Sequence, residues 1–136
     1  MVRIVDASVA IKWFIEEPGH EVAIAMLEEL IEKPRNFAVP ELFFFELFHV
    51  FHRILPRATN EQFDLLTTVV ELPIQRFSMT RELLEACSEF QKMGLSGYDS
   101  AYVGLAKVLK GQWVTFDSKA HAVVRHTNLS KLLLAQ

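Results

Sequence analysis

The chain is poor in cysteine: Cys87 is the only one among its 136 residues. A single cysteine excludes a disulfide framework within the chain, and it excludes a zinc site built from several thiolates. It also favours an intracellular protein, because disulfides are typical of oxidising compartments. The apolar surroundings of Cys87 predict a small buried residue with no chemical role.

Long apolar runs are absent as well. No stretch approaches the roughly 20 apolar residues that a membrane-spanning helix needs, and residues 1–6 are too short and strand-like for a signal peptide. We therefore expect a cytoplasmic protein with no membrane segment.

Positive charge is scarce over most of the chain. The net charge of −3 argues at first against a nucleic-acid partner. However, residues 103–136 contain five Lys or Arg and one acid, whereas residues 1–102 contain nine Lys or Arg and 16 acids. The basic carboxyl-terminal third could hold a phosphate backbone. A solvated basic face is the alternative, and charge alone does not separate the two.

The chain does contain a regular alternation of short apolar runs and amphipathic segments. Its length and its hydrophobic content of 51% suit one domain over residues 1–136. We predict strands at residues 2–5, 36–39, 73–77, 112–116 and near 126–128, and helices at residues 7–14, 20–33, 40–55, 60–71, 80–92, 96–110 and from 118, with a last turn at 130–134. This order predicts a parallel sheet covered by helices on both faces, an α/β/α sandwich.

Proline, glycine and asparagine mark the expected ends of these helices. Pro40 is expected at the first position of its helix and Pro56 just beyond the end of the same helix. Gly94 and Gly111 are expected to terminate the helices that precede them. Asn60 is expected to cap the helix over residues 60–71.

Four carboxylates stand in different segments: Asp6, Glu46, Asp99 and Asp117. Asp6 and Asp117 each follow a predicted strand, and the carboxyl ends of parallel strands meet at the edge of a sheet where ligands bind. Glu46 lies on a helix that is apolar almost all round, and Asp99 lies near the start of another helix. If the fold gathers these acids, they repel one another until a divalent cation neutralises them.

Three of these acids also have an ordinary structural explanation. A turn that leaves the strand accounts for Asp6. Ser96 stands three residues before Asp99, which is the spacing of a capping box. Asp117 is a preferred N-cap for the helix that follows it.

Glu46 is harder to explain in this way, because lone acids are rare on largely apolar helices. The alternative is a solvated glutamate paired with His49 or Arg53. The same helix presents aromatic side chains on every side (Phe43, Phe44, Phe45, Phe48 and Phe51), which one helix cannot hide in a small monomer. We expect a homodimer contact, a groove for a partner protein, or both.

Four segments together resemble the PIN domain, and more narrowly the VapC-type toxins of toxin–antitoxin pairs. They are Val-Asp-Ala-Ser-Val at residues 5–9, Pro-Glu-Leu-Phe-Phe-Phe-Glu at 40–46, Gly-Leu-Ser-Gly-Tyr-Asp-Ser-Ala-Tyr at 94–102 and Val-Thr-Phe-Asp at 114–117. The resemblance covers the whole chain in order. One departure is His49, where the family often has asparagine.

This resemblance implies a three-layer α/β/α fold and an endoribonuclease that depends on Mg²⁺ or Mn²⁺. The family's acidic quartet falls on Asp6, Glu46, Asp99 and Asp117, and its supporting polar positions fall on Ser8 and Thr115. The family also implies a dimer that is inhibited by a cognate antitoxin, whose carboxyl-terminal segment lies over the active site.

We therefore hypothesise that Asp6 and Asp99 are the principal metal ligands, with Glu46 and Asp117 completing the site directly or through water. Oxygen ligands without clustered cysteine or histidine favour Mg²⁺ or Mn²⁺ over zinc. The metal would activate a water that hydrolyses RNA, and single-stranded RNA is the more accessible substrate.

Three other functions are alternatives to this hypothesis. A phosphatase of the haloacid-dehalogenase type needs a second acid two residues after its aspartate, where this chain has Ser8. A non-catalytic domain that binds a metal and a partner protein remains open, although the placement of Glu46 counts against it. A PIN nuclease that processes RNA without an antitoxin also remains open.

Overall fold

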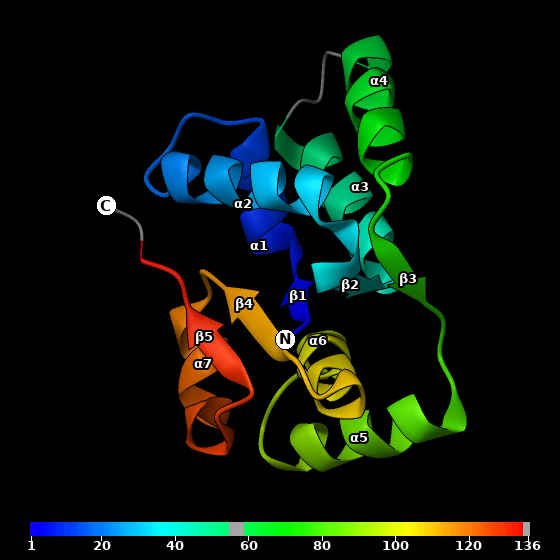
Figure 1. Ribbon diagram of the computed structural model, residues 1–136, viewed down its shortest axis with the longest axis vertical. Helices are drawn as coiled ribbons and strands as arrows, with labels where there is room; N and C mark the ends of the chain where they lie inside the picture. The colour runs from blue at the N-terminus through cyan, green and yellow to red at the C-terminus, as the bar shows by residue number, and fades with distance from the viewer. Residues whose placement is uncertain (55–58, 135–136) are drawn as a thin grey trace.

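The computed structural model describes residues 1–54 and 59–134. Its centre is a five-stranded parallel sheet in the order β3-β2-β1-β4-β5 (Figure 1). The strands are β1 (Arg3–Val5), β2 (Phe37–Pro40), β3 (Gln75–Phe77), β4 (Gln112–Thr115) and β5 (Ser130–Leu132). The helices are α1 (Ala7–Ala10), α2 (His20–Glu32), α3 (Leu42–Ile54), α4 (Thr59–Val70), α5 (Arg81–Lys92), α6 (Gly97–Leu109) and α7 (Ser118–Val124), with short 3₁₀ turns η1 (Ile11–Trp13), η2 (Pro34–Asn36) and η3 (Arg125–Thr127).

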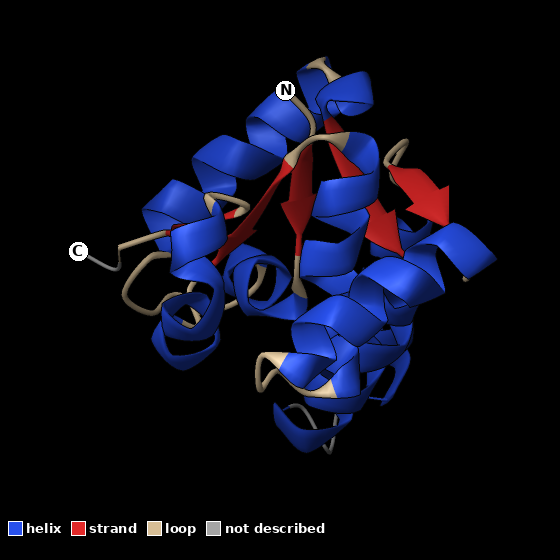
Figure 2. Cartoon of the chain, turned by 90° about the horizontal axis from the view of Figure 1, so that it is seen from below, coloured by secondary structure: helices blue, strands red, loops and turns tan. Residues whose placement is uncertain are grey.

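Helices cover both faces of the sheet, so the predicted three-layer α/β/α arrangement is confirmed. Figure 2 shows the strands lying between helices on either side. Helix α6 packs across β2, β1 and β4, with α5 against its outer side, while α1 and α3 lie on the opposite face. Within the described ranges, the structure contains no helix of the length and hydropathy that crossing a membrane requires.

The strand order reverses beside β1. The chain moves outward from β1 through β2 to β3, and then returns to place β4 on the other side of β1. Val5 at the end of β1 pairs with Val114 of β4, so both strands end at the same edge of the sheet. In open α/β sheets, this point of reversal is where ligands bind. Asp6 directly follows β1, and Asp117 stands two residues after the end of β4.

The core lies on both faces of the sheet and is largely aromatic and aliphatic. All four residues of β2 are buried, and so is the central part of α6 from residue 100 to 106. Gly104 brings α5 close to α6, because a Cβ at this position would lie 3.0 Å from Cys87 Sγ. Cys87 is buried in this contact, as the sequence predicted.

The fifth strand is not where the sequence placed it. Residues 125–127 form the 3₁₀ turn η3, and the strand is Ser130–Leu132, where a turn was expected. Asn128 adopts a left-handed conformation with φ of 61°, which ends the turn. Trp113 then donates its backbone N–H to Leu129 at 2.7 Å, and this bond draws the following residues alongside β4.

Pro40 is the last residue of β2 and not the first residue of α3, which begins at Leu42. Pro40 pairs with Phe77 of β3, and the next backbone N–H, that of Glu41, donates to Phe77 at 2.9 Å. The fixed φ of proline suits a strand end as well as a helix start. The expected end of this helix near residue 55, and Pro56 after it, lie outside the described residues.

The helix ends also differ from prediction in two details. Helix α6 ends with Lys110 in the left-handed conformation, so Gly111 is not the left-handed cap. Gly111 is needed for space, because a Cβ there would lie 2.2 Å from the Val2 carbonyl oxygen. Asn60 lies inside α4, which begins at Thr59, while Gly94 has the positive φ expected after α5.

Candidate functional site

Asp6 follows β1 directly and has only 6% of its surface exposed. Its Oδ1 accepts the backbone N–H groups of Ser8 at 3.0 Å and Val9 at 3.3 Å, so the side chain caps α1. The Ser8 hydroxyl donates to the same oxygen at 2.5 Å. The other oxygen, Oδ2, accepts the indole N–H of Trp113 at 2.9 Å. Burial raises the pKa of Asp6, although these donors act in the opposite direction.

A polar network joins the ends of β1 and β4. The Ser8 hydroxyl oxygen accepts the backbone N–H of Phe116 at 3.1 Å and lies 3.3 Å from Thr115 Oγ1. Thr115 Oγ1 accepts the backbone N–H of Asp117 at 3.0 Å. Asp117 Oδ1 in turn accepts the N–H of Ala120 at 3.0 Å and caps α7, as its sequence context suggested. The structure thus places both predicted supporting residues between two of the four acids.

Glu46 is half-buried on α3, and its partner comes from another helix. Its Oε1 accepts the hydroxyl of Tyr102 on α6 at 2.5 Å, so the partner shown is neither His49 nor Arg53. Burial raises the pKa of Glu46, and the negative charges of Asp6 and Asp99 raise it further, while the hydrogen bond from Tyr102 opposes them.

Asp99 lies in the first turn of α6. The Ser96 hydroxyl accepts the backbone N–H of Asp99 at 3.0 Å, which confirms the expected helix cap. Burial and the neighbouring charge of Asp117 raise the pKa of Asp99. The cap therefore fixes the start of α6, where the charge of Asp117 reaches the Asp99 carboxylate.

The four acids act on one another as a connected group. The charges of Asp6 and Asp99 raise the pKa of Glu46, and the charge of Asp117 raises the pKa of Asp99. Burial is the largest cause that raises the pKa of the Tyr102 hydroxyl. The negative charges of Glu46, Asp6 and Asp99 raise it further. Burial is the largest cause of these shifts and negative charge adds to it, so a bound cation would relieve the repulsive part.

The donor set fits a hard divalent cation in its chemistry. Its side chains offer carboxylate and hydroxyl oxygens, which Mg²⁺ and Mn²⁺ prefer. Within residues 1–54 and 59–134, however, the structure contains no three His, Cys, Asp or Glu side chains close enough together to hold one ion. Simultaneous binding by three of the acids would thus require their side chains to turn toward a common point.

Two residues in this site were not assigned a role from the sequence: Trp113 and Tyr102. A signal for each was present. Trp113 is two residues before Thr115 and therefore points to the same face of β4. Tyr102 is three residues after Asp99 and therefore lies on the same side of α6.

A hollow of about 370 Å³ lies beside Glu46. It is lined by Leu42, Phe45, Glu46, His49, Val50 and Tyr98. Phe45 and Tyr98 expose two thirds of their surfaces. The departure from the family pattern, His49, therefore stands next to one of the four acids.

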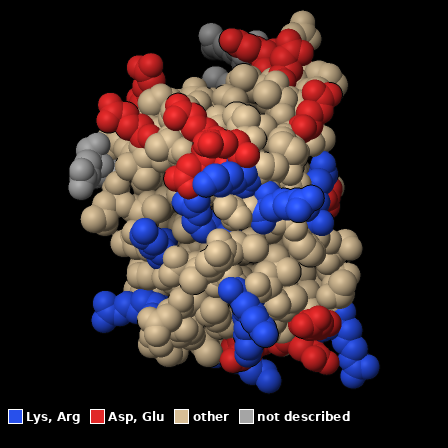
Figure 3. Space-filling view, viewed as in Figure 1, with Lys and Arg blue, Asp and Glu red and all other residues tan. Residues whose placement is uncertain are grey.

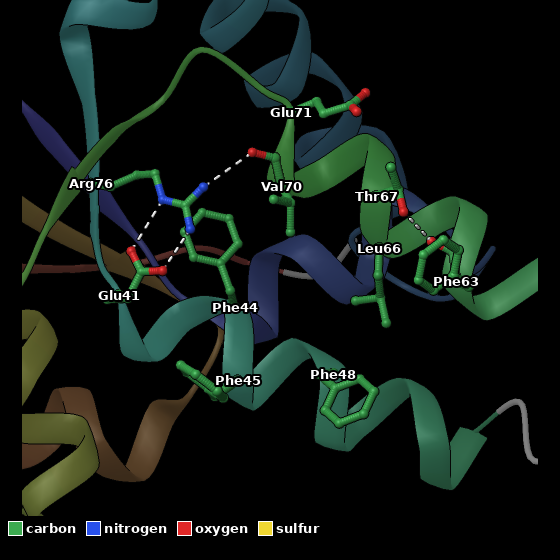
Figure 4. Close-up of a pocket in the computed structure, with 10 residues that line it drawn as sticks. All are labelled: Glu41, Phe44, Phe45, Phe48, Phe63, Leu66, Thr67, Val70, Glu71 and Arg76. Carbon is green, nitrogen blue, oxygen red and sulfur yellow. Dashed lines mark hydrogen bonds and ion pairs between the residues drawn. The ribbon is translucent and has the colours of Figure 1, made fainter.

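A second concave surface, the α3–α4 groove, has a different character (Figure 4). It has a volume of about 410 Å³, and Phe45 and Phe48 of α3 lie across from Phe63, Leu66 and Val70 of α4. At one end, Arg76 binds Glu41 through two hydrogen bonds of 2.6 and 3.1 Å and lies 3.9 Å from the centre of the Phe44 ring. The groove thus contains a paired charge at its end and apolar side chains along its walls.

Surface charge is divided between regions. On the face in Figure 3, acidic side chains gather mainly in the upper part, while Lys and Arg form a band across the middle and continue below. Of the five basic residues beyond position 102, Lys107 pairs with Glu89. The other four are exposed and form no ion pair within the described part of the chain: Lys110, Lys119, Arg125 and Lys131.

This is a doubly wound α/β protein with acids at its point of reversal, the edge at which this class of protein binds ligands. Comparison with protein families narrows this class, because the PIN domain family matches residues 3–125. The chain therefore belongs to the PIN domain family. No curated protein matches it by sequence.

Several solved structures share the fold at low sequence identity. A toxin–antitoxin complex from Klebsiella pneumoniae is 16% identical, covers 88% of this chain and 90% of its own, and has a TM-score of 0.63. VapC20 of Mycobacterium tuberculosis, a toxin that cleaves the sarcin-ricin loop, is 14% identical over 88% and 93%, with a TM-score of 0.67. VapBC2 of Rickettsia felis, bound to a promoter DNA fragment, is 10% identical over 98% and 99%, with a TM-score of 0.71.

Proposed function

We propose that this PIN domain is an endoribonuclease that depends on Mg²⁺ or Mn²⁺. One observation supports the proposal. Negative charge from Asp6 and Asp99 reaches Glu46, and that of Asp117 reaches Asp99, beside the point where the strand order reverses. When bound, the cation would lower the pKa of a coordinated water and stabilise the leaving oxygen of a phosphodiester.

In this proposal Asp6 and Asp99 are the principal metal ligands. Asp6 is the most fixed of the acids, because backbone and side-chain donors hold both of its oxygens. Glu46 and Asp117 complete the site directly or through water. Ser8 and Thr115 hold the ends of β1 and β4 together and so maintain the distance between the acids that follow them.

The substrate proposed is single-stranded RNA, whose bases and backbone are accessible. Helix α7 begins directly after Asp117 and carries Lys119, and η3 adds Arg125. These exposed cations are suited to hold the phosphate backbone beside the acids, which themselves repel it. The hollow beside Glu46 has room for part of a nucleotide next to the cleaved bond.

We further propose that the protein is the toxin of a VapBC-type pair, acts in the cytoplasm and forms a homodimer. Three structural neighbours support the first point, because they are toxins or toxin–antitoxin complexes. The exposed aromatic side chains of α3 support a partner, since Phe45 and Phe48 are 67% and 59% exposed. An antitoxin, a second copy, or both would cover them.

The test of activity is degradation of RNA oligonucleotides by the purified protein with Mg²⁺ or Mn²⁺. Cleavage should require the cation and should stop when EDTA is added. A protein that degrades RNA equally well in EDTA would contradict the proposed chemistry. A protein that binds the cation and a partner but leaves RNA intact would instead be the non-catalytic binding domain.

A separate experiment tests the toxin assignment. A small reading frame beside the gene should encode a protein that binds this chain and suppresses its RNA cleavage. Active cleavage with no such neighbouring protein would favour a PIN nuclease of RNA processing.

A further inference from the structure

Two buried aromatic residues, Trp113 of β4 and Tyr102 of α6, lie directly beneath the acids. Trp113 is fully buried and Tyr102 nearly so. Their rings stack with centres 6.2 Å apart and an angle of 14° between their planes. The stacked pair therefore spans from the sheet to the helix layer.

The polar group of each side chain donates a hydrogen bond to a different acid. The Trp113 indole N–H donates to Asp6 Oδ2 at 2.9 Å, and the Tyr102 hydroxyl donates to Glu46 Oε1 at 2.5 Å. Buried Trp and Tyr generally find a partner for these atoms, but a backbone carbonyl would suffice. The chain has that ordinary arrangement at Trp13, whose indole N–H donates to the Ala23 carbonyl at 3.0 Å.

The consequence is mechanical. A carboxylate that accepts a hydrogen bond on one oxygen resists rotation about its side-chain torsion, and bonds to an ionised group are roughly twice as strong as neutral ones. Because the two rings pack against each other, one contiguous pair of buried side chains donates to both Asp6 and Glu46. The pair thus sets how two acids from different layers face the same edge.

We propose that Trp113 and Tyr102 are positioning residues, which orient Asp6 and Glu46 to receive a divalent cation. The inference rests on the proposed function, because it assumes that these acids bind the cation. In this proposal the two aromatic residues act on the acids and do not touch the substrate.

The experiment compares Trp113→Phe and Tyr102→Phe with the wild type by calorimetric titration with Mn²⁺. Each variant keeps an aromatic ring and loses only the donor and, for Trp113, part of the ring. Loss of a partner that orients a metal ligand typically weakens metal binding by about 10- to 100-fold, and we expect a loss in this range for each variant. RNA cleavage should fall in parallel and recover at high Mn²⁺, which loss of folding would not produce.

Trp13→Phe is the matched control. It makes the same chemical change in another buried tryptophan, whose indole N–H donates to the Ala23 carbonyl and not to an acid. Because distant sites contribute independently, Mn²⁺ affinity should stay within about twofold of wild type. If Trp113→Phe and Tyr102→Phe fold and also bind Mn²⁺ within twofold of wild type, the positioning role is overturned while the nuclease proposal stands.

The wild-type protein gives a second readout that needs no folded variant. The chain has two tryptophans, so its ¹⁵N-correlated NMR spectrum contains two indole N–H signals, and Trp13→Phe identifies which is which. Added Mg²⁺ should shift the Trp113 signal and leave that of Trp13 in place. Binding of Mg²⁺ without a shift at Trp113 overturns the positioning role, whereas a wild type that binds neither Mg²⁺ nor Mn²⁺ overturns both proposals.

Discussion

Helix α3 contributes to two surfaces of opposite character. Toward α6 it presents Glu46, which belongs to a group of acids held by hydrogen bonds from buried side chains. Toward α4 it presents Phe48, which faces apolar side chains across the α3–α4 groove. Burial and the charges of neighbouring acids raise the pKa of Glu46 and of Asp99, so that region is electrostatically unfavourable without a cation, whereas the groove exposes apolar surface that favours a partner.

On the proposed function, the acids carry out the chemistry and the groove binds a partner. A catalytic site tolerates unfavourable charge because rigid elements fix it in place, and here Asp6 is fixed by α1, β4 and the stacked rings. A docking surface needs only accessible apolar area. The two regions should therefore separate cleanly when each is changed alone.

The largest effect is expected for Asp99→Asn. It removes one proposed principal ligand and one negative charge while keeping the shape, and metal-dependent RNA cleavage should fall by at least about 100- to 1,000-fold, the scale seen when a group that stabilises transition-state charge is lost. The matched control is Asp64→Asn on α4, an exposed residue that is the one aspartate outside the group. Equal cleavage by Asp99→Asn and wild type would remove the acids from the mechanism.

A smaller loss is expected for Ser8→Ala. The Ser8 hydroxyl donates to Asp6 and accepts the Phe116 N–H, so its loss should lower cleavage by about tenfold or more and stability by about 1 kcal/mol. Ser88→Ala is the control, because that exposed hydroxyl bonds only the backbone of its own helix. If both variants behave alike in RNA cleavage and urea unfolding, the network between β1 and β4 has no special role.

The acids should also give the metal-free protein an unusual dependence on pH. The pKa values of Asp6, Glu46 and Asp99 are raised above their ordinary values of 3.8 for Asp and 4.5 for Glu. The folded protein therefore binds more protons than the unfolded chain above these values, and the free energy of unfolding should fall as pH rises through the raised pKa values. Urea unfolding with EDTA present measures this slope, which Asp99→Asn should flatten. A rise in stability over the same window would contradict the electrostatic group.

The smallest effect on cleavage is expected for changes in the groove. Phe48→Ser and Phe63→Ser alter side chains that are 59% and 71% exposed, so stability should change by about 0.5 kcal/mol or less and cleavage should remain. Association with a second copy or with the antitoxin should weaken, as sedimentation measures. A groove variant that is folded but inactive on RNA would break the separation between the two regions.

Much of the fold was predictable because its signals are local. The apolar run that ends at Asp6 and the Ser96 cap of α6 each depend on neighbouring residues, and both appear in the structure. The strand β5 was predicted too early in the chain, near residues 126–128, because its position depends on pairing with β4 through Leu129. Propensity alone cannot supply such a long-range contact.

The candidate site was predictable in part for the same reason. The four acids stood out by type and by place in the sequence, and the structure joins them electrostatically. The roles of Trp113 and Tyr102 could not be predicted, because their hydrogen bonds connect residues 107 and 56 positions apart. Sequence patterns indicate on which face of an element a side chain lies, but they do not identify its hydrogen-bond partner.

A crystal structure of the protein grown with Mn²⁺ would show whether these acids hold a divalent cation. Anomalous scattering should place Mn²⁺ at the carboxyl edge of the sheet, with oxygens of Asp6 and Asp99 about 2.0–2.2 Å from the ion, as expected for a small octahedral cation. Under conditions in which the protein cleaves RNA, a peak elsewhere, or none at this edge, would contradict the account.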